Sequence, residues 1–390
     1  MDYNSLLNQN IVSVKPSGIR KFFDLAERME DVISLGVGEP DFPTPWHIRH
    51  AAIQSLENNK TRYTSNWGLM ELRRAIKEFL QRKYSLCYDH ESEIAVTVGG
   101  SEAIDAAIRA LVSQGDEVII PQPSFVCYEP LTLLAGGVPV ILETKAENEF
   151  KITAQELKAK ITPKTKAVVL PYPCNPTGAI MEGKELAAIA DVLRGTNIFI
   201  ISDEIYSELT FSGNGHCSIA SMDGMRERTV IINGFSKSYS MTGWRLGFAC
   251  GPKEIMKQII KIHQFGIMSA PTTSQYAAIE ALKNGDNDIE RMLEEYDSRR
   301  RVMVSGFNEL GLTCREPKGA FYAFPSIKST GMSSEEFCER LLESQHVALV
   351  PGTAFGDSGE GFVRASYCYS VEHIREALRR IELFLKEIKG

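Results

Sequence analysis

Short apolar runs and amphipathic segments alternate along most of the chain. Runs rich in Val, Ile and Leu that end at Gly, Pro, Asn or Ser predict buried strands. Apolar residues spaced three and four apart predict helices that bury one face. The predicted strands cover residues 32–35, 93–98, 118–120, 139–142, 167–170, 198–201 and 229–232, a further short apolar run covers 246–249, and the helices cover 45–57, 70–84, 103–111, 129–135, 154–160 and 184–193.

This alternation is typical of an α/β fold with a largely parallel central sheet, whose ligands bind at the carboxyl ends of the strands. The pattern changes after about residue 252. Helices are predicted at 253–265, 273–283 and 287–310, strands at 347–350 and 361–366, and a closing helix at 371–388. We therefore expect a large domain at 45–283 and a smaller α+β domain at 284–390, to which an N-terminal arm at 1–44 contributes. A first helix is expected in that arm after Ser17 and Gly18.

Composition narrows the function classes. The 390 residues are 43% apolar and 24% charged, as in ordinary globular proteins. The net charge of −7 and the lack of basic runs argue against a nucleic-acid or anionic-membrane partner. No apolar run approaches the ~20 residues that cross a bilayer. The eight scattered cysteines form no CxxC pair, which favours reduced thiols and a cytoplasmic location. The seven histidines form no HxxxH pair, so no metal is expected.

One lysine follows a predicted strand and lies among small and hydroxyl-bearing residues, close in sequence to an arginine. Lys237 comes after the strand at 229–232, among Ser, Tyr, Thr and Gly, and Arg245 lies eight positions later. A desolvated lysine has a lowered pKa and becomes an amine nucleophile that forms Schiff bases. An arginine is suited to bidentate capture of phosphate. The pair indicates pyridoxal phosphate (PLP), although these residues alone also fit a surface loop with an ordinary arginine.

PLP also needs a carboxylate at its pyridine nitrogen, a donor to its ring oxygen, a phosphate cup and a group that orients the substrate. Candidates for each part follow predicted strands. They are Asp203 for the nitrogen, Tyr206 and Asn175 for the ring oxygen, Phe125 over the ring, Ser236, Arg245 and the turn of Gly99, Gly100, Ser101 and Glu102 for the phosphate, and Arg364 for the substrate carboxylate. Simpler roles exist for single residues, such as a helix N-cap for Asp203 and a salt bridge for Arg364.

Together these motifs make the chain resemble the class I/II aminotransferases of PLP fold type I, in particular their microbial aromatic and aspartate branch. The matching segments are residues 36–42, 63–72, 97–103, 175–178, 202–206, 236–247, 319–322, 350–356 and 363–367. The resemblance implies a homodimer in which Tyr63 reaches the phosphate of the neighbouring subunit. It also implies that Gly38 offers its backbone to the substrate carboxylate beside Arg364. Gly234 stands where a serine is often found, which removes one hydroxyl from the expected phosphate cup.

The implied reaction is ping-pong transamination from an L-amino acid to a 2-oxo acid, with 2-oxoglutarate as the expected acceptor and Lys237 as general acid and base. Ser101 stands where some aspartate-selective members carry a lysine. An aromatic or other neutral donor is therefore favoured over aspartate, in a pocket that Trp67, Phe321 and Tyr322 are candidates to line. Two alternatives are a carbon–sulfur β-lyase on the same fold and a non-catalytic PLP-binding sensor. The sensor would need a DNA-binding domain, for which the short arm before residue 36 leaves little room.

Overall fold

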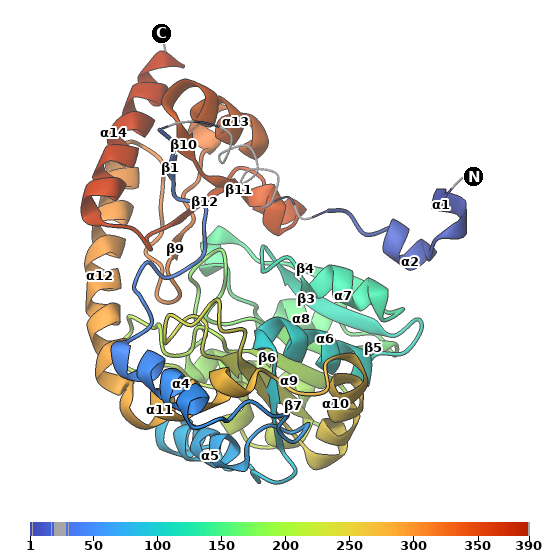
Figure 1. Ribbon diagram of the computed structural model, residues 1–390. Helices are drawn as coiled ribbons and strands as arrows, with labels where there is room; N and C mark the ends of the chain where they lie inside the picture. Colours follow the sequence, from blue (N-terminus) through green and yellow to red (C-terminus); the bar gives the residue numbers. More distant parts are fainter. Residues whose placement is uncertain (2, 17, 19–28, 30, 389–390) are drawn as a thin grey trace.

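The computed structural model describes residues 1, 3–16, 18, 29 and 31–388 (Figure 1). Within these residues the largest sheet has seven strands: β2 (Ile94–Thr97), β3 (Glu117–Gln122), β4 (Val138–Glu143), β5 (Thr165–Leu170), β6 (Phe199–Asp203), β7 (Thr229–Gly234) and β8 (Gly247–Cys250). Their spatial order is β2-β8-β7-β6-β5-β3-β4. β8 runs antiparallel to the other six strands, which share one direction, so the prediction of an α/β fold with a largely parallel sheet is confirmed.

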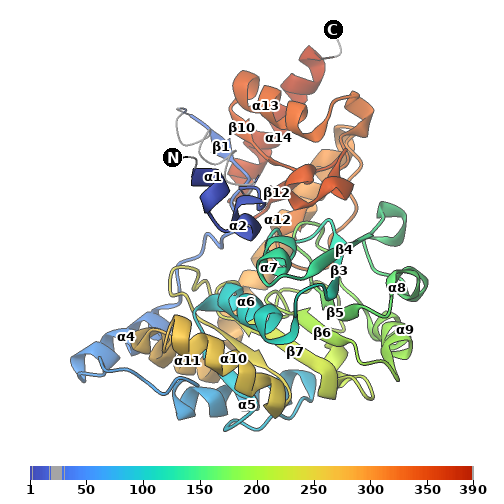
Figure 2. The ribbon, with the colours of Figure 1, turned by 90° about the vertical axis from the view of Figure 1, so that its right-hand side faces the viewer.

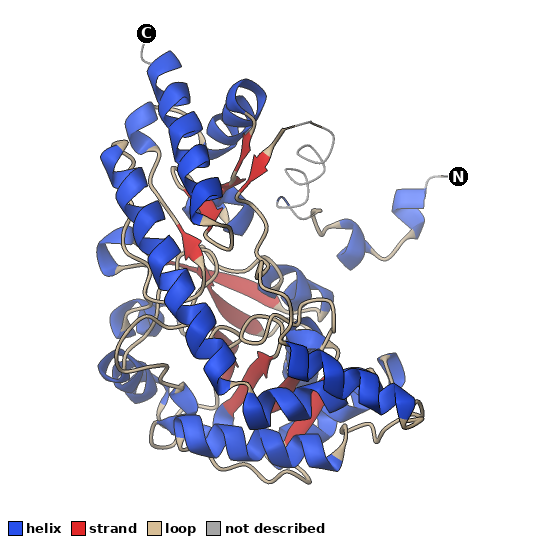
Figure 3. Ribbon diagram, turned by 60° about the vertical axis from the view of Figure 1, so that its left-hand side comes forward, coloured by secondary structure: helices blue, strands red, loops and turns tan. Residues whose placement is uncertain are grey.

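Helices enclose this sheet on both faces (Figure 3). They are α4 (Trp46–Glu57), α5 (Met70–Tyr84), α6 (Gly99–Leu111), α7 (Tyr128–Leu134), α8 (Ala154–Lys160), α9 (Gly183–Leu193), α10 (Lys253–Gly266) and α11 (Thr272–Asn284). The strands bury alternate residues in different cores. Val230 and Ile232 of β7 pack with α6 and α10, whereas Ile231 packs with α4, α5 and α11. This alternation follows from the two-residue period of a strand, and it explains why strands buried on both faces are continuously apolar.

Two smaller sheets lie above the seven-stranded sheet in the view of Figure 2. One pairs β1 (Ile33–Ser34) with β10 (Val347–Ala348), and the other joins β11 (Val350–Pro351), β12 (Val363–Ser366) and β9 (Tyr322–Ala323). Three helices pack around them: α12 (Asp286–Glu309), α13 (Ser334–Gln345) and α14 (Val371–Glu387). Through β1, the segment before residue 44 joins the C-terminal part of the chain.

Two sequence-based expectations need correction in this part. The predicted single strand at 347–350 is wrong, because Leu349 separates β10 from β11 and the two strands pair in different sheets. Helix α13 was not predicted, although Phe337, Cys338 and Leu341 bury one helical face.

The N-terminal arm contains two one-turn helices, α1 (Tyr3–Leu6) and α2 (Gln9–Val12). The first helix expected after Ser17 and Gly18 falls largely outside the described residues, and the domain boundaries at 44/45 and 283/284 stay predictions. Among the residues that the structure describes, no helix is long and apolar enough to cross a membrane.

Candidate active site

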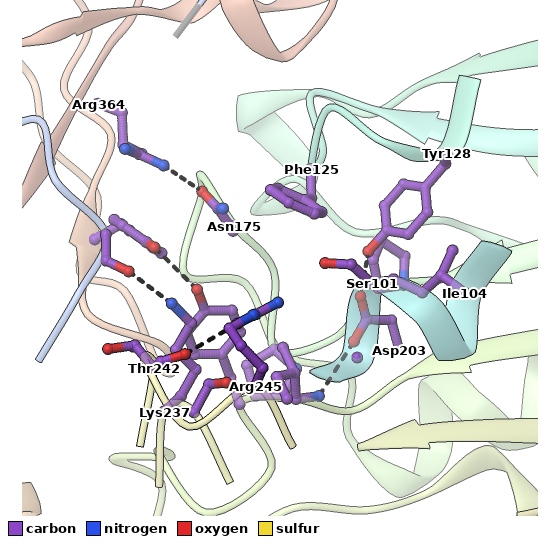
Figure 4. Close-up of a pocket in the computed structure, with 18 residues that line it drawn as sticks. Ser101, Ile104, Phe125, Tyr128, Asn175, Asp203, Lys237, Thr242, Arg245 and Arg364 are labelled. Carbon is purple, nitrogen blue, oxygen red and sulfur yellow. Dashed lines mark hydrogen bonds between the residues drawn. The ribbon is translucent and has the colours of Figure 1, made fainter. Parts of the chain in front are cut away.

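A cavity of about 280 Å³ lies where β5, β6 and β7 end, and Arg364 of β12 lines it from the side of the smaller sheets (Figure 4). Most residues predicted for the site line it, although they come from segments far apart in the sequence. They are Gly38, Gly100, Ser101, Phe125, Asn175, Asp203, Tyr206, Ser236, Lys237, Arg245 and Arg364. Their position agrees with the rule that ligands of parallel sheets bind at the carboxyl ends of the strands.

Lys237 enters this cavity from the turn that follows β7. Its Nζ donates a hydrogen bond of 2.6 Å to the carbonyl oxygen of Gly38. The ring of Phe321 has its centre 5.6 Å from Nζ, and that of Tyr206 lies 6.0 Å away. Withdrawal from water into this aromatic setting lowers the pKa of Lys237 to about 8. The side chain is therefore an amine that loses its proton near pH 8 rather than near its ordinary pKa, which favours a nucleophile.

Asp203 is the last residue of β6, and its carboxylate is buried. Oδ2 accepts a hydrogen bond of 2.6 Å from the Tyr128 hydroxyl, and Oδ1 accepts one of 3.2 Å from the backbone N–H of Ile205. Burial raises the pKa of Asp203 to about 6, although both hydrogen bonds favour the ionised form. A carboxylate held this way suits a cationic partner inside the cavity. Tyr128 was missed from the sequence, where nothing distinguishes it from other buried tyrosines.

A turn with the geometry to bind an anion opens α6 beside Arg245. Gly99 has φ +76°, and a Cβ there would lie 2.8 Å from Arg245 Nη2, so only glycine leaves room for the guanidinium. The first N–H groups of a helix lack intrahelical partners, and the helix dipole favours an anion there. Ser101 and Ser236 add hydroxyls to the cavity wall. Gly234 packs tightly on Gly247, because a Cβ on Gly234 would lie 3.0 Å from the Gly247 Cα.

Arg364 projects from β12 and is buried. Its Nη1 donates a hydrogen bond of 2.9 Å to Asn175 Oδ1, and its Nη2 donates to the carbonyl oxygen of Gly36. The buried Nε has no partner within the described chain. The centre of the Tyr322 ring lies 4.4 Å from the guanidinium carbon. An arginine fixed in this way, with a donor still unused, is suited to bind a carboxylate.

Other predicted residues lie elsewhere. Gly99 backs Arg245 without lining the cavity, and the Glu102 side chain contacts Val98 and His263 instead. Tyr63 is 83% exposed. Of the three candidates for the substrate side-chain pocket, only Tyr322 lines the cavity, and its hydroxyl lies 2.9 Å from that of Tyr206. Further lining residues that the sequence analysis did not identify include Ile104, Pro171, Pro173, Ile205 and Thr242.

Comparison with known proteins decides the family. Residues 30–381 match the family described as aminotransferase class I and II. The chain belongs to this family. It is 52% identical to the putative aminotransferase YugH of Bacillus subtilis (strain 168), over 98% of each chain. It is 49% identical to a probable N-acetyl-LL-diaminopimelate aminotransferase of the same strain, over 97% of this chain and 96% of that protein. The aspartate aminotransferase of Pyrococcus abyssi is 47% identical, over 96% of this chain and 97% of that protein.

A solved structure agrees with this assignment. The aromatic aminotransferase of Pyrococcus horikoshii OT3 superposes with a TM-score of 0.90 at 45% identity, covering 94% of this chain and 99% of that one. Aminotransferases of classes I and II depend on PLP, and the cavity of this aminotransferase offers the donors that PLP requires. An amine, a buried carboxylate and an anion-binding turn with an adjacent arginine surround one space. The structure therefore fits the cofactor that the family uses.

Proposed function

We propose that this aminotransferase moves an amino group from an aromatic or other neutral L-amino acid to a 2-oxo acid by a ping-pong mechanism, with aspartate as a weaker donor. The supporting observation is the charge of the cavity wall. The cationic residues found there in the described chain are Lys237, Arg245 and Arg364. If these serve the cofactor aldehyde, its phosphate and the α-carboxylate, none of them is left for a second carboxylate on the donor. Apolar residues such as Ile104 and Phe125 face the same space.

Several relatives are named after different amino-donor substrates. Those with printed substrates act on aspartate, on aromatic amino acids, or in one probable case on N-acetyl-LL-diaminopimelate. The anion-binding turn carries Ser101 rather than a lysine, which supports an amino donor with a neutral side chain. The acceptor is a separate question, because 2-oxoglutarate carries a second carboxylate of its own. It stays the expected acceptor from the resemblance and is tested independently of the donor.

Each residue of the site has a proposed task. Bound PLP supplies an electron sink for the charge that develops on the substrate α-carbon. Arg364, with Asn175 beside it, holds the substrate carboxylate and thereby orients the α-carbon–hydrogen bond. Lys237 Nζ accepts the α-proton and returns it as general acid and base, for which a pKa of about 8 is well placed. With PLP bound, Asp203 would hold the pyridine nitrogen in its protonated form and Tyr206 would donate to the ring oxygen.

We further propose a homodimer. Several large apolar or aromatic side chains outside the cavity are strongly exposed, among them Tyr63 at 83%, Phe265 at 87% and Trp46 at 61%. Large apolar side chains with this exposure support an interface, and Tyr63 would act at the neighbouring subunit's phosphate. The cytoplasmic location stays a prediction, supported by eight cysteines that are all free.

The deciding experiment mixes PLP-loaded enzyme with single L-amino acids and no acceptor. Phenylalanine or tyrosine should replace the absorbance band of the lysine-bound cofactor by that of the aminated cofactor, and an equal amount of 2-oxo acid should appear. Addition of 2-oxoglutarate, pyruvate or oxaloacetate, one at a time, should restore the first band and identify the acceptor. A wide preference for aspartate would contradict the proposed donor class. Pyruvate and ammonia formed from cysteine conjugates, with an unchanged band, would identify a β-lyase.

Lys237→Ala tests the assigned amine directly. The variant should lose the band of lysine-bound cofactor and at least ~10³-fold in turnover, because a positioned general base contributes ~10²–10⁴-fold. Transamination at the wild-type rate in this variant would show that another group does the chemistry.

A further inference from the structure

A buried pair of ionisable side chains lies behind the anion-binding turn. His263 of α10 is 1% exposed, and its Nδ1 lies 2.6 Å from Glu102 Oε1. The other oxygen of the same carboxylate accepts a hydrogen bond from the backbone N–H of Val98, the residue directly before α6. One carboxylate therefore joins the start of α6 to the neighbouring helix α10, which packs against it.

The negative charge of this carboxylate is unfavourable for a phosphate bound at the start of α6. Glu102 lies in the first turn of α6, where its charge is favourable for the empty helix but repels a phosphate bound at the same end. In the structure the Glu102 side chain does not line the cavity, because its two oxygens are hydrogen-bonded to Val98 and His263 instead. By accepting from Val98 it also satisfies one free N–H of the helix start from within the protein. The N–H groups of the next residues are then left for a ligand.

Among the residues that the structure describes, Glu102 is the only hydrogen-bond partner of the His263 side chain. In a neutral ring that donates from Nδ1, Nε2 is an acceptor, and this buried Nε2 has no hydrogen-bond partner in the described residues. A buried polar atom without a partner is destabilising, and an apolar side chain would avoid it. The bond from Nδ1 to Glu102 is the interaction that His263 adds.

We propose that His263 is a positioning residue for the cofactor phosphate: it holds the Glu102 carboxylate away from the anion-binding turn. This inference rests on the proposed phosphate site at Gly99–Ser101 and Arg245. Without the histidine donor, the carboxylate either stays buried with one oxygen unsatisfied or turns towards the phosphate. In the first outcome the carboxylate loses the N–H dipole that offsets its charge, and in the second its charge comes closer to the phosphate. Both outcomes weaken binding of a phosphate-bearing ligand, whereas the ring of the cofactor is not affected.

The test compares PLP with pyridoxal, which lacks the phosphate. Both are titrated into apoenzyme. The dissociation constant of pyridoxal divided by that of PLP reports how much the phosphate contributes to binding. His263→Leu should lower this ratio roughly tenfold to a hundredfold, the range of a charge-assisted hydrogen bond, with pyridoxal affinity nearly unchanged. His263→Asn, whose amide can donate near the position of Nδ1, should restore most of the ratio. His263→Gln, of similar polarity but with its amide near Nε2, should not, and it replaces the leucine variant if that one does not fold.

A second variant separates positioning from general loss of structure. In the double variant His263→Leu with Glu102→Gln, no free carboxylate remains, so the ratio should recover towards the wild-type value. The matched control is His216→Leu, which breaks another buried pair, between His216 Nε2 and Glu204 Oε2 at 2.9 Å, outside the cavity wall. This control should leave the ratio unchanged.

Arg245→Gln tests the proposed phosphate site separately from the role of His263. If it lowers the ratio and His263→Leu does not, the role of His263 is refuted and the phosphate site stands. If neither variant changes the ratio, the proposed phosphate site itself is wrong. A lowered ratio in His263→Leu that Glu102→Gln fails to rescue would also refute the positioning role.

Discussion

Removing the Tyr128 hydroxyl should make the stability of the apoprotein depend more strongly on pH. In Tyr128→Phe, the donor that lies 2.6 Å from Asp203 Oδ2 is lost. Burial already raises the pKa of Asp203 to about 6, which means that its ionised form destabilises the folded apoprotein by ~3 kcal/mol relative to an ordinary aspartate. A hydrogen bond to a charged group contributes ~1.5–3 kcal/mol. Its loss should therefore raise the pKa of Asp203 by a further ~1–2 units.

Proton linkage gives the direction in which the stability of the folded apoprotein changes with pH. The folded-state pKa lies above the unfolded value, so the folded state holds the proton more tightly and loses stability as pH rises. For the wild type this loss should level off above about pH 6. For Tyr128→Phe it should continue for ~1–2 further units. The difference in unfolding free energy between wild type and variant should therefore grow by ~1.3–2.3 kcal/mol from pH 5 to pH 8.

Urea unfolding of apoprotein at four pH values and fixed protein concentration measures this difference. Tyr172→Phe is the matched control, because Tyr172 is also buried but its hydroxyl contacts only the backbone of Ile152 and Phe150. That variant should show a difference independent of pH. If the Tyr128→Phe difference were equally flat from pH 5 to pH 8, the hydroxyl would not stabilise ionised Asp203, and the reasoning would be refuted.

Two further predictions concern the cations of the site. Because the pKa of Lys237 is lowered to about 8, the rate at which apoenzyme captures PLP should rise about tenfold from pH 7 to pH 9 and then level off; a rate that keeps rising above pH 9 would indicate an ordinary lysine. Arg364→Lys should raise the KM for amino and 2-oxo acids roughly tenfold to a hundredfold through loss of bidentate hydrogen bonds. Arg300→Lys, at another buried arginine paired outside the cavity with Asp297 and Glu316, should leave KM unchanged, and an equal effect of both changes would contradict the role of Arg364.

The sequence by itself determined most of the elements, although not α13, and the chemistry at their ends. Strand and helix periods are local properties, since they record which face of each segment is buried. They predicted the parallel sheet, and with it the place of Lys237, Asp203 and the turn at Gly99 near one edge. The same local information failed at residues 347–350, because an apolar run does not say that Leu349 divides it between two sheets.

Only the tertiary structure decided which polar groups meet. Arg364 and Asn175 are 189 positions apart and share a hydrogen bond of 2.9 Å, and Tyr128 meets Asp203 across 75 positions. Glu102 was expected at the phosphate, yet its side chain is held by His263, 161 positions away. Such contacts depend on how helices and sheets pack against one another. A buried hydroxyl or carboxylate must find a partner wherever that packing places one, and no local pattern in the sequence specifies which partner it will be.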